Sequence, residues 1–188
     1  GPTSDEIARG YYSYDALVGL RSQVESYGLI LEGFGTPPWR LCYKWMLGLP
    51  GRDEQIENLQ KSIRNMGAAG VPLLVFNMHA LRFYRTSRAM PERGGAQSSG
   101  FEMARVADAP LMVGGRGIQT DLIPPEHRRS ISDEEMWDNY AYFIKAVVPV
   151  AEEAGVKLAL HPDDPPVPAI AGVARIMRDP EAFRRALE

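Results

Sequence analysis

The chain has a single cysteine, no long hydrophobic run and no long basic run, and each absence excludes a class of protein. Cys42 alone cannot form an intrachain disulfide, which favours a reducing compartment, and we expect it to be buried as a small apolar residue. No apolar stretch approaches the roughly 20 residues that a membrane-spanning helix requires. No charged segment followed by an apolar one opens the chain, so we expect no signal peptide. The sequence therefore predicts a cytoplasmic protein with no membrane partner.

The charge balance argues against nucleic acid as a partner. The 21 Lys and Arg and 24 Asp and Glu residues give a net charge of −3. Basic residues gather only in short spots, such as His127-Arg128-Arg129 and Arg184-Arg185, whereas a nucleic-acid footprint lines a helix or a groove. With 188 residues, 45% of them hydrophobic, the chain has the size and composition of one globular domain, spanning residues 1–188.

A unit of amphipathic helix, glycine and short apolar strand recurs along the sequence. Strict alternation of helices with nearly continuous apolar strands is typical of a parallel sheet covered by helices, so we expect an α/β fold. A last helix is expected over residues 180–188. The expected helices of the repeat are residues 13–27, 53–69 (with Asp53 as its cap) and 132–154, and the strands that follow them are 29–34, 71–77 and 156–160.

The strand count limits the kind of parallel sheet. No Gly-x-Gly-x-x-Gly motif opens a helix, and the glycines at residues 33–35 and 114–117 are better explained as turns, so a dinucleotide site has little support. A closed (β/α)8 barrel typically takes about 250 residues. We therefore expect a partial barrel of about three to four βα units.

Residues 79–131 form a long insertion in this pattern and contain no regular element that the sequence identifies. The insertion follows an expected strand end and begins with aromatic and basic residues, from Arg82 to Arg85. A stretch rich in glycine and serine, residues 94–100, comes next. Loops of this length in a compact domain are usually functional or disordered, so an active-site lid and a flexible insertion both remain open.

The segment His161-Pro162-Asp163-Asp164-Pro165-Pro166 follows the apolar strand of the third unit. Ligands and metals bind at the carboxyl ends of strands in barrels built from such units. Prolines on both sides stiffen the loop and exclude a helix directly after it. Because aspartate and proline are also ordinary turn formers, a simple turn is the alternative.

Other polar and aromatic residues near expected strand ends are weaker candidates. Asn77 could contact a substrate or cap a loop. His79 could reach a metal, although a lone histidine beside arginines is more often at the surface, and Glu32 would be partly buried at the barrel mouth. The tryptophans are expected to pack rather than to form a sugar platform: Trp39, Trp45 and Trp137.

Two long stretches carry a family resemblance. Residues 136–166, MWDNYAYFIKAVVPVAEEAGVKLALHPDDPP, resemble bacterial mannonate dehydratases, and so do residues 47–65, LGLPGRDEQIENLQKSIRN. The resemblance implies a xylose-isomerase-like (β/α)8 TIM barrel. It also implies a metal-dependent carbon–oxygen lyase (a hydro-lyase) that dehydrates D-mannonate to 2-dehydro-3-deoxy-D-gluconate in hexuronate (glucuronate) catabolism.

The resemblance also assigns residues to a site. His161 is implied to be the first metal ligand, and a rigidly presented imidazole suits Mn²⁺ or Fe²⁺. Asp163 and Asp164 could bind substrate hydroxyls, hold the imidazole or serve the turn, and Asn77 joins them as a substrate-binding candidate. The family's other ligands and its acid/base residues are expected beyond Glu188, so the catalytic residues are unknown. Cys42 does not match the family's cysteine. These 188 residues alone should therefore be inactive.

The expected partner is a small-molecule sugar acid, and homo-oligomerisation is left open. Residues 32–46 and 77–88 differ from the family's usual sequence, and both follow expected strand ends. A sugar or sugar-acid isomerase or epimerase on the same fold is therefore one alternative. A non-catalytic partial domain is the other.

Overall fold

The structure is a computed structural model that describes residues 4–35, 37–80, 85–106, 112–113, 116–117, 124–127 and 129–188. The chain divides into two compact units. Unit 1 comprises Gly1–Asn77 and Glu134–His161, and unit 2 comprises Met78–Asp133 and Pro162–Glu188. The expectation of a single domain stays a prediction.

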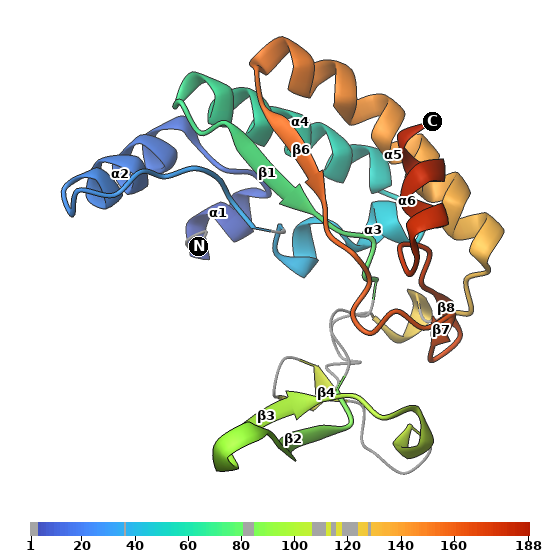
Figure 1. Cartoon of the computed structure of the whole chain (residues 1–188). Coiled ribbons are helices and arrows are strands. Elements are labelled where there is room, and N and C mark those ends of the chain that lie inside the picture. Colours follow the sequence, from blue (N-terminus) through green and yellow to red (C-terminus); the bar gives the residue numbers. More distant parts are fainter. Residues whose placement is uncertain are drawn as a thin grey trace. The chain divides into compact units, whose positions relative to one another are not determined.

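Unit 1 contains the three predicted helices and a pair of parallel strands (Figure 1). The long helices begin and end within about three residues of the expected positions. Asp53 lies in the first turn of its helix and is not the cap; Gly51 takes that position with a positive φ of 82°. The elements of this unit are α1 (Ser4–Arg9), α2 (Tyr14–Glu25), the 3₁₀ turn η1 (Trp39–Leu41), α3 (Tyr43–Met46), α4 (Arg52–Ala68), β1 (Leu73–Phe76), α5 (Asp133–Ala154) and β6 (Lys157–Leu160).

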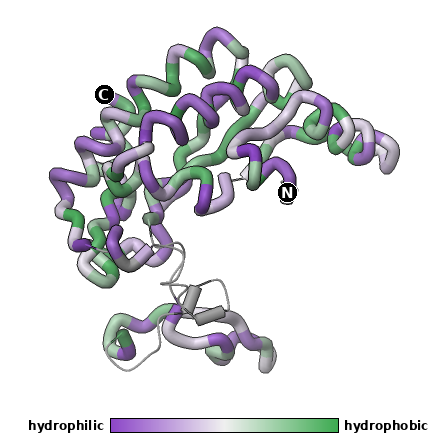
Figure 2. The backbone as a smooth tube through the Cα atoms, turned by 180° about the vertical axis from the view of Figure 1, so that it is seen from behind, coloured by the Kyte–Doolittle hydropathy of each residue, from purple (hydrophilic) through white to green (hydrophobic). Residues whose placement is uncertain are grey.

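Strands β1 and β6 pair in parallel, as the alternating pattern predicts. Their register joins Leu73 to Lys157 at one end and Phe76 to Leu160 at the other. Helices α4 and α5 lie on one face of the pair (Figure 1), and hydrophobic and hydrophilic residues alternate along the helical coils (Figure 2). Both helices therefore turn an apolar stripe to the sheet and a polar one to solvent.

The core between these helices and strands is dominated by large side chains. Phe143 of α5 stacks on Trp45 of α3, with ring centroids 3.9 Å apart and planes 8° apart, and it meets Phe76 at the end of β1. Most of the predicted apolar positions of α4 and α5 are buried, which supports the periodicity, whereas Ile144 and Val148, expected in the same stripe, are only partly buried. The buried positions are Ile56, Leu59, Ile63, Met66, Met136, Tyr140, Phe143 and Val147.

The expected strand at residues 29–34 is wrong except at its last residue. Phe34 forms an isolated parallel bridge to Leu74, whereas Leu29 and Ile30 are 62% and 77% exposed. Gly33 allows the close approach at that end, because a Cβ there would lie 2.7 Å from the Leu73 carbonyl oxygen. A strand needs a row of paired residues, and only Phe34 reaches β1. Glu32 is consequently exposed and not partly buried.

Unit 2 contains short antiparallel pairs and a terminal helix, so the expectation that residues 79–131 lack regular elements is wrong. Gly94 and Gly95, with φ of 72° and 81°, lie between the first two strands, and the Gly/Ser-rich stretch contributes a strand. The elements are β2 (Ser87–Pro91), η2 (Arg93–Gly95), β3 (Gln97–Gly100), η3 (Met103–Arg105), β4 (Met112–Val113), β5 (Arg116–Gly117), η5 (Pro125–His127), β7 (Ala169–Ile170), β8 (Val173–Ala174) and α6 (Pro180–Leu187).

Some predictions in this unit fall on residues that lie outside the described part of the chain. Arg82, Phe83 and Tyr84 are among them, and so are Gly114 and Gly115. A lid function for the insertion stays a prediction. The terminal helix is confirmed, with Asp179 accepting a hydrogen bond from the Ala182 amide at 2.9 Å. Of the helices in the described ranges, none is both long and apolar enough to cross a bilayer.

Candidate active site at the strand ends

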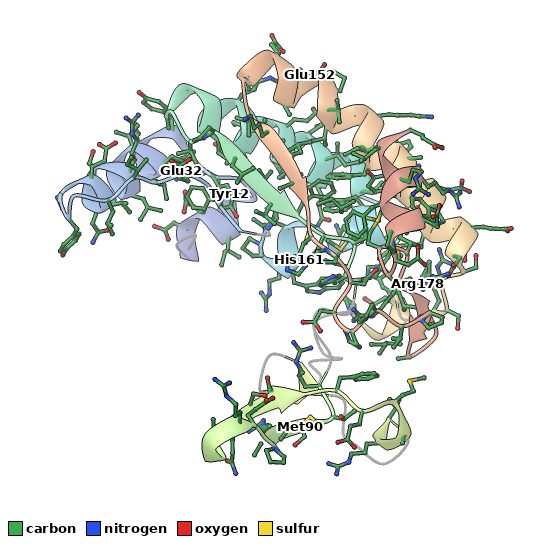
Figure 3. The ribbon with its side chains drawn as sticks, in the orientation of Figure 1. Tyr12, Glu32, Met90, Glu152, His161 and Arg178 are labelled. Atoms are coloured by element: carbon green, nitrogen blue, oxygen red, sulfur yellow. The ribbon has the colours of Figure 1, made fainter. Side chains whose placement is uncertain are left out.

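Asn77 and His161 occupy the same edge of the β1–β6 pair. Each follows the last residue of its strand, and those last residues, Phe76 and Leu160, are partners in the parallel register. The His161 amide donates to the Phe76 carbonyl at 2.8 Å, which extends the ladder by one step. Figure 3 shows His161 just beyond the arrowhead of β6. The two residues therefore lie side by side at the carboxyl end of the strands, where the sequence places them.

These two side chains differ in exposure. Asn77 is buried, at 7% exposure, whereas the His161 side chain is partly open to solvent. A partly exposed imidazole at a strand end can bind a metal or a ligand without unfolding its surroundings. The geometry is compatible with the predicted metal-ligand role of His161.

The loop after His161 belongs to unit 2 and contains a buried carboxylate. Asp163 is 4% exposed, and its Oδ2 accepts a hydrogen bond from the Met177 amide at 2.6 Å. Its Oδ1 lies 3.4 Å from Nε2 of His79 and 3.5 Å from Nη1 of Arg175. A buried carboxylate requires such partners, because an uncompensated charge is costly to remove from water.

His79 lies in the interior, so the expectation of a surface position is wrong. It is 2% exposed, and its Nε2 lies 2.6 Å from the Pro162 carbonyl oxygen. These polar partners offset the cost of burying the imidazole. Arg175, which the sequence reading did not select, is 3% exposed beside the same carboxylate. The apolar residues on both sides of Arg175 in the sequence, 173–174 and 176–177, are the local pattern that could have indicated its burial.

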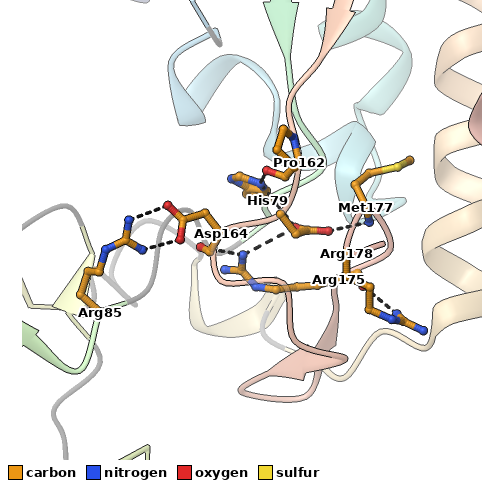
Figure 4. Close-up of polar contacts among 8 residues, drawn as sticks. His79, Arg85, Pro162, Asp164, Arg175, Met177 and Arg178 are labelled. Carbon is orange, nitrogen blue, oxygen red and sulfur yellow. Dashed lines mark hydrogen bonds and ion pairs between the residues drawn. The ribbon is translucent and has the colours of Figure 1, made fainter. Parts of the chain in front are cut away.

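Asp164 points to a different partner. Arg85 donates to both of its carboxylate oxygens, at 2.6 and 2.5 Å, and Arg175 Nη1 donates to its backbone carbonyl at 3.0 Å (Figure 4). Burial raises the pKa of Asp164, but the hydrogen bonds and charge of Arg85, with His79 and Arg175, outweigh it and the net pKa is lowered. Asp164 is thus held ionised, with about a third of its side chain exposed.

The described residues at this edge do not form a complete set of metal ligands. Across the described ranges, no three His, Cys, Asp or Glu side chains gather as a metal cluster would require. Cys42 is buried as predicted, with Sγ near the carbonyl oxygens of Pro37, Pro38 and Trp39. A hollow of about 600 Å³ is lined by Val156 and Leu158, around the start of β6, which is the opposite end of that strand from His161.

The chain matches the sequence model of one enzyme family along almost its whole length. The D-mannonate dehydratase (UxuA) model covers residues 5–188. The chain belongs to this family. Trp39 and Trp45, at 6% and 1% exposure, are packed in the interior, as expected, whereas Trp137 is only partly buried.

Relatives within the family are found in several bacteria. The mannonate dehydratase of Streptococcus pneumoniae (strain 70585) is 36% identical over 182 residues, which cover 91% of this chain and 49% of that protein. Mannonate dehydratase 2 of Halalkalibacterium halodurans is 28% identical over 193 residues, covering 97% of this chain and 55% of that protein.

A solved structure agrees with these sequences. The crystal structure of mannonate dehydratase from Streptococcus suis serotype 2 matches with a TM-score of 0.79 and 36% identity, over 93% of this chain and 48% of that one. The chain therefore shares the mixed helix and strand fold of the family and spans about half the length of the curated relatives that it matches. The number of barrel units stays a prediction.

Proposed function

We propose that the polypeptide containing these residues is a mannonate dehydratase, a metal-dependent hydro-lyase that converts D-mannonate to 2-dehydro-3-deoxy-D-gluconate in hexuronate catabolism. The chain would supply three to four βα units of a xylose-isomerase-like barrel. The observation that carries the proposal is the match in sequence and fold to the Streptococcus suis enzyme, which is 36% identical over 93% of this chain. A cytoplasmic location and homo-oligomerisation remain predictions.

His161 is the residue that we propose as a metal ligand from this half of the family's length. Its backbone is tied to β1 through the Phe76 carbonyl, so the imidazole is presented from a fixed strand end. Bound Mn²⁺ or Fe²⁺ would act as a Lewis acid on the substrate carboxylate and make the neighbouring C2 proton easier to remove. Because no three His, Cys, Asp or Glu side chains gather among the described residues, we propose that residues outside them complete the set of ligands.

We propose Asn77 of unit 1 as a substrate contact, and we propose Asp164 of unit 2 as a separate candidate for one. The amide of Asn77 could donate to or accept from a substrate hydroxyl beside His161, and the ionised carboxylate of Asp164 can accept from one. Asp163 as a substrate contact stays a prediction, but its buried oxygens already face Met177, His79 and Arg175. In the reaction the C2 proton and the C3 hydroxyl leave as water, and the resulting enol becomes the 2-keto product. The base and the acid for these transfers stay unassigned.

The test uses the full polypeptide that contains these residues, at whatever length it is encoded. With D-mannonate and Mn²⁺ we expect a 2-keto acid, measured by its semicarbazone absorbance. His161→Gln should abolish turnover and weaken Mn²⁺ binding, because the amide is a poor substitute for imidazole. His127→Gln is the matched control, since His127 lies in η5 and not at a strand end, and it should retain both. Turnover of a different sugar acid with no product from mannonate would refute the proposal and favour an isomerase or epimerase.

A further inference from the structure

Arg85 and Asp164, both in unit 2, form a two-point ion pair that is partly open to solvent. Nη1 and Nη2 of Arg85 donate to the two carboxylate oxygens of Asp164 at 2.6 and 2.5 Å (Figure 4). The two side chains are 21% and 35% exposed. A planar guanidinium that meets both oxygens of a carboxylate is also the arrangement with which proteins recognise carboxylate ligands. The pair therefore shows what Arg85 can bind, with the side chain of Asp164 as its present occupant.

The backbone beside Arg85 is fixed independently of Asp164. Directly after Arg85, the Thr86 amide donates to the Gly100 carbonyl at 2.9 Å, and Thr86 Oγ1 accepts from the Glu102 amide at 2.7 Å. These contacts join the segment to the base of the β2–β3 hairpin. A side chain that is anchored in this way loses less conformational freedom when a ligand binds, which favours binding.

The backbone of Asp164 is also held, so its carboxylate can leave Arg85 without a movement of the loop. The Asp164 carbonyl accepts from Nη1 of Arg175 at 3.0 Å, and the amide of Asp163 donates to the Met177 carbonyl at 2.8 Å. A rotation about the side-chain bonds of Asp164 is therefore sufficient to release the guanidinium. Because partly exposed ion pairs are weak, this release should lower the affinity for an incoming ligand by only about two- to fivefold.

Of the two arginines beside this loop, Arg85 is the one whose carboxylate partner can be exchanged. Arg175 lies 3.5 Å from the carboxylate of Asp163, whose side chain is 0% exposed and accepts from the Met177 amide at 2.6 Å. That carboxylate should stay with Arg175, because a buried charge is costly to leave without a partner. An incoming carboxylate at Arg85 would replace the charge that Asp164 supplies there now.

We propose that Arg85 is a binding site for small hydroxy carboxylates, a class that includes sugar acids, and that Asp164 occupies it until such a ligand arrives. The ligand carboxylate would accept from both Nη atoms of the guanidinium. The displaced carboxylate of Asp164 is ionised at neutral pH and can accept a hydrogen bond from a hydroxyl of the same ligand. The site depends on contacts within unit 2 and not on the proposed function, so each proposal can fail without the other.

Calorimetric titration of the full polypeptide that contains these residues measures the binding. A chelator first removes metal, because a bound metal could itself hold a hydroxy acid. The probes are D-gluconate, which has a carboxylate and hydroxyls, D-glucitol, which has hydroxyls alone, and inorganic phosphate, an anion of a different shape. Gluconate should bind about tenfold or more tightly than the other two. Glucitol or phosphate binding as tightly as gluconate would overturn the proposal.

Two variants of the pair should change gluconate binding in opposite directions. Arg85→Gln removes the guanidinium and should weaken binding about tenfold or more. Asp164→Asn removes the competing charge, keeps an oxygen that accepts from a hydroxyl, and should tighten binding about two- to fivefold. A pair that only stabilises the loop would not give this opposition. Parent-like affinity in Arg85→Gln, or binding by Asp164→Asn that is no tighter than in the parent chain, would overturn the proposal.

Arg178→Gln is the matched control in unit 2. Nη2 of Arg178 donates to the carboxylate of Asp133 at 2.7 Å, and the two side chains are 28% and 44% exposed. Nη1 of Arg178 donates instead to the Arg175 carbonyl, so this guanidinium is divided between two acceptors. Its loss should leave gluconate binding unchanged. A loss of binding as large as that of Arg85→Gln would indicate general attraction by positive charge and would count against the site.

Arg85→Lys decides the matter if Arg85→Gln does not fold. Lysine keeps the positive charge but lacks the planar fork, so gluconate should bind about tenfold more weakly than to the parent chain. In protein labelled with ¹⁵N-arginine, the Nε–H signal that is absent from Arg85→Lys should shift when gluconate is added to the parent chain. Gluconate binding without that shift would place the ligand elsewhere and overturn the proposal.

Discussion

Two glycines in helices should respond to alanine in opposite directions. Gly67 lies near the end of α4, where an added Cβ would overlap the carbonyl oxygen of Ala154 and lie 3.1 Å from its Cβ, at the end of α5. Gly19 lies in the middle of α2 with nothing within 4 Å of such a Cβ. Both glycines belong to unit 1. The comparison therefore separates helix propensity from the close approach of α4 and α5.

The magnitudes follow from two competing effects at Gly67. Alanine in a helix interior is favoured over glycine by about 0.8–1.0 kcal/mol, and by less in the last turn. Overpacking a closely packed contact costs about 1–3 kcal/mol. The steric cost should win, so Gly67→Ala should lower the free energy of unfolding by about 1–2 kcal/mol. At Gly19 only the propensity acts, and Gly19→Ala should raise it by about 0.5–1 kcal/mol.

Urea denaturation of the two variants and the parent chain, followed by tryptophan fluorescence, measures both values. Trp45, buried in unit 1, contributes to that signal. The slope of the transition should stay the same in all three proteins, so that a shift in midpoint reports a change in stability. If Gly67→Ala is as stable as the parent chain, or more stable, the close approach of α4 to the end of α5 is not as described.

Three further predictions concern the core and two titrating groups. Phe143→Ala should lower the free energy of unfolding, measured by urea denaturation, by about 3–5 kcal/mol, because Phe143 is buried against Trp45 and Phe76. Tyr142→Ala, at a neighbouring position that is 44% exposed, should lower it by about 1 kcal/mol or less. Arg85→Ala should lower the free energy of unfolding by about 1 kcal/mol or less at neutral pH, because the ion pair of Arg85 with Asp164 is partly screened by solvent. The pKa of Asp164 is lowered, so this stabilisation is present above the ordinary carboxyl pKa and is lost as the pH falls through the folded-state pKa. The urea midpoints of Arg85→Ala and the parent chain should therefore converge in acid. A constant difference between the midpoints would contradict the pairing of Arg85 with Asp164. Burial first, then the charges of Cys42 and Glu6, raise the pKa of Tyr12. The contribution of its phenol to stability is therefore complete below the ordinary tyrosine pKa and is lost above it. Above a pH of about 10, the free energy of unfolding of the parent chain should fall by about 1.4 kcal/mol per pH unit relative to Tyr12→Phe. Parallel pH profiles of the two proteins would refute this.

The elements that the sequence predicted well are those in which periodicity and burial agree. The apolar stripe of α4, from Ile56 to Met66, repeats at helical spacing and is buried along its length. The parallel pairing of β1 and β6 follows from two apolar runs that are separated by a helix. The position of His161 at a strand end needed nothing more than these two inferences.

The parts that the sequence did not predict depend on contacts between distant residues. His79 is buried with its Nε2 2.6 Å from the Pro162 carbonyl oxygen and 3.4 Å from the Asp163 carboxylate, both more than 80 positions later, and no local pattern encodes such a pairing. Residues 29–33 are apolar enough for a strand but only Phe34 pairs with β1. The β2–β3 hairpin is polar and rich in glycine and serine, so it resembles a loop by composition, although its two strands pair in the structure.

The parallel pairing of β1 with β6 also governs when the molecule can fold during synthesis. Leu73 can pair with Lys157 only after the residues between them have been synthesised. A ribosome adds roughly 5–20 residues per second. For several seconds the apolar strand β1 therefore emerges without its partner, while the intervening residues of unit 2 are still being added. Nascent chains stalled before and after β6 has left the ribosome should consequently differ in their dependence on chaperones that bind exposed apolar strands.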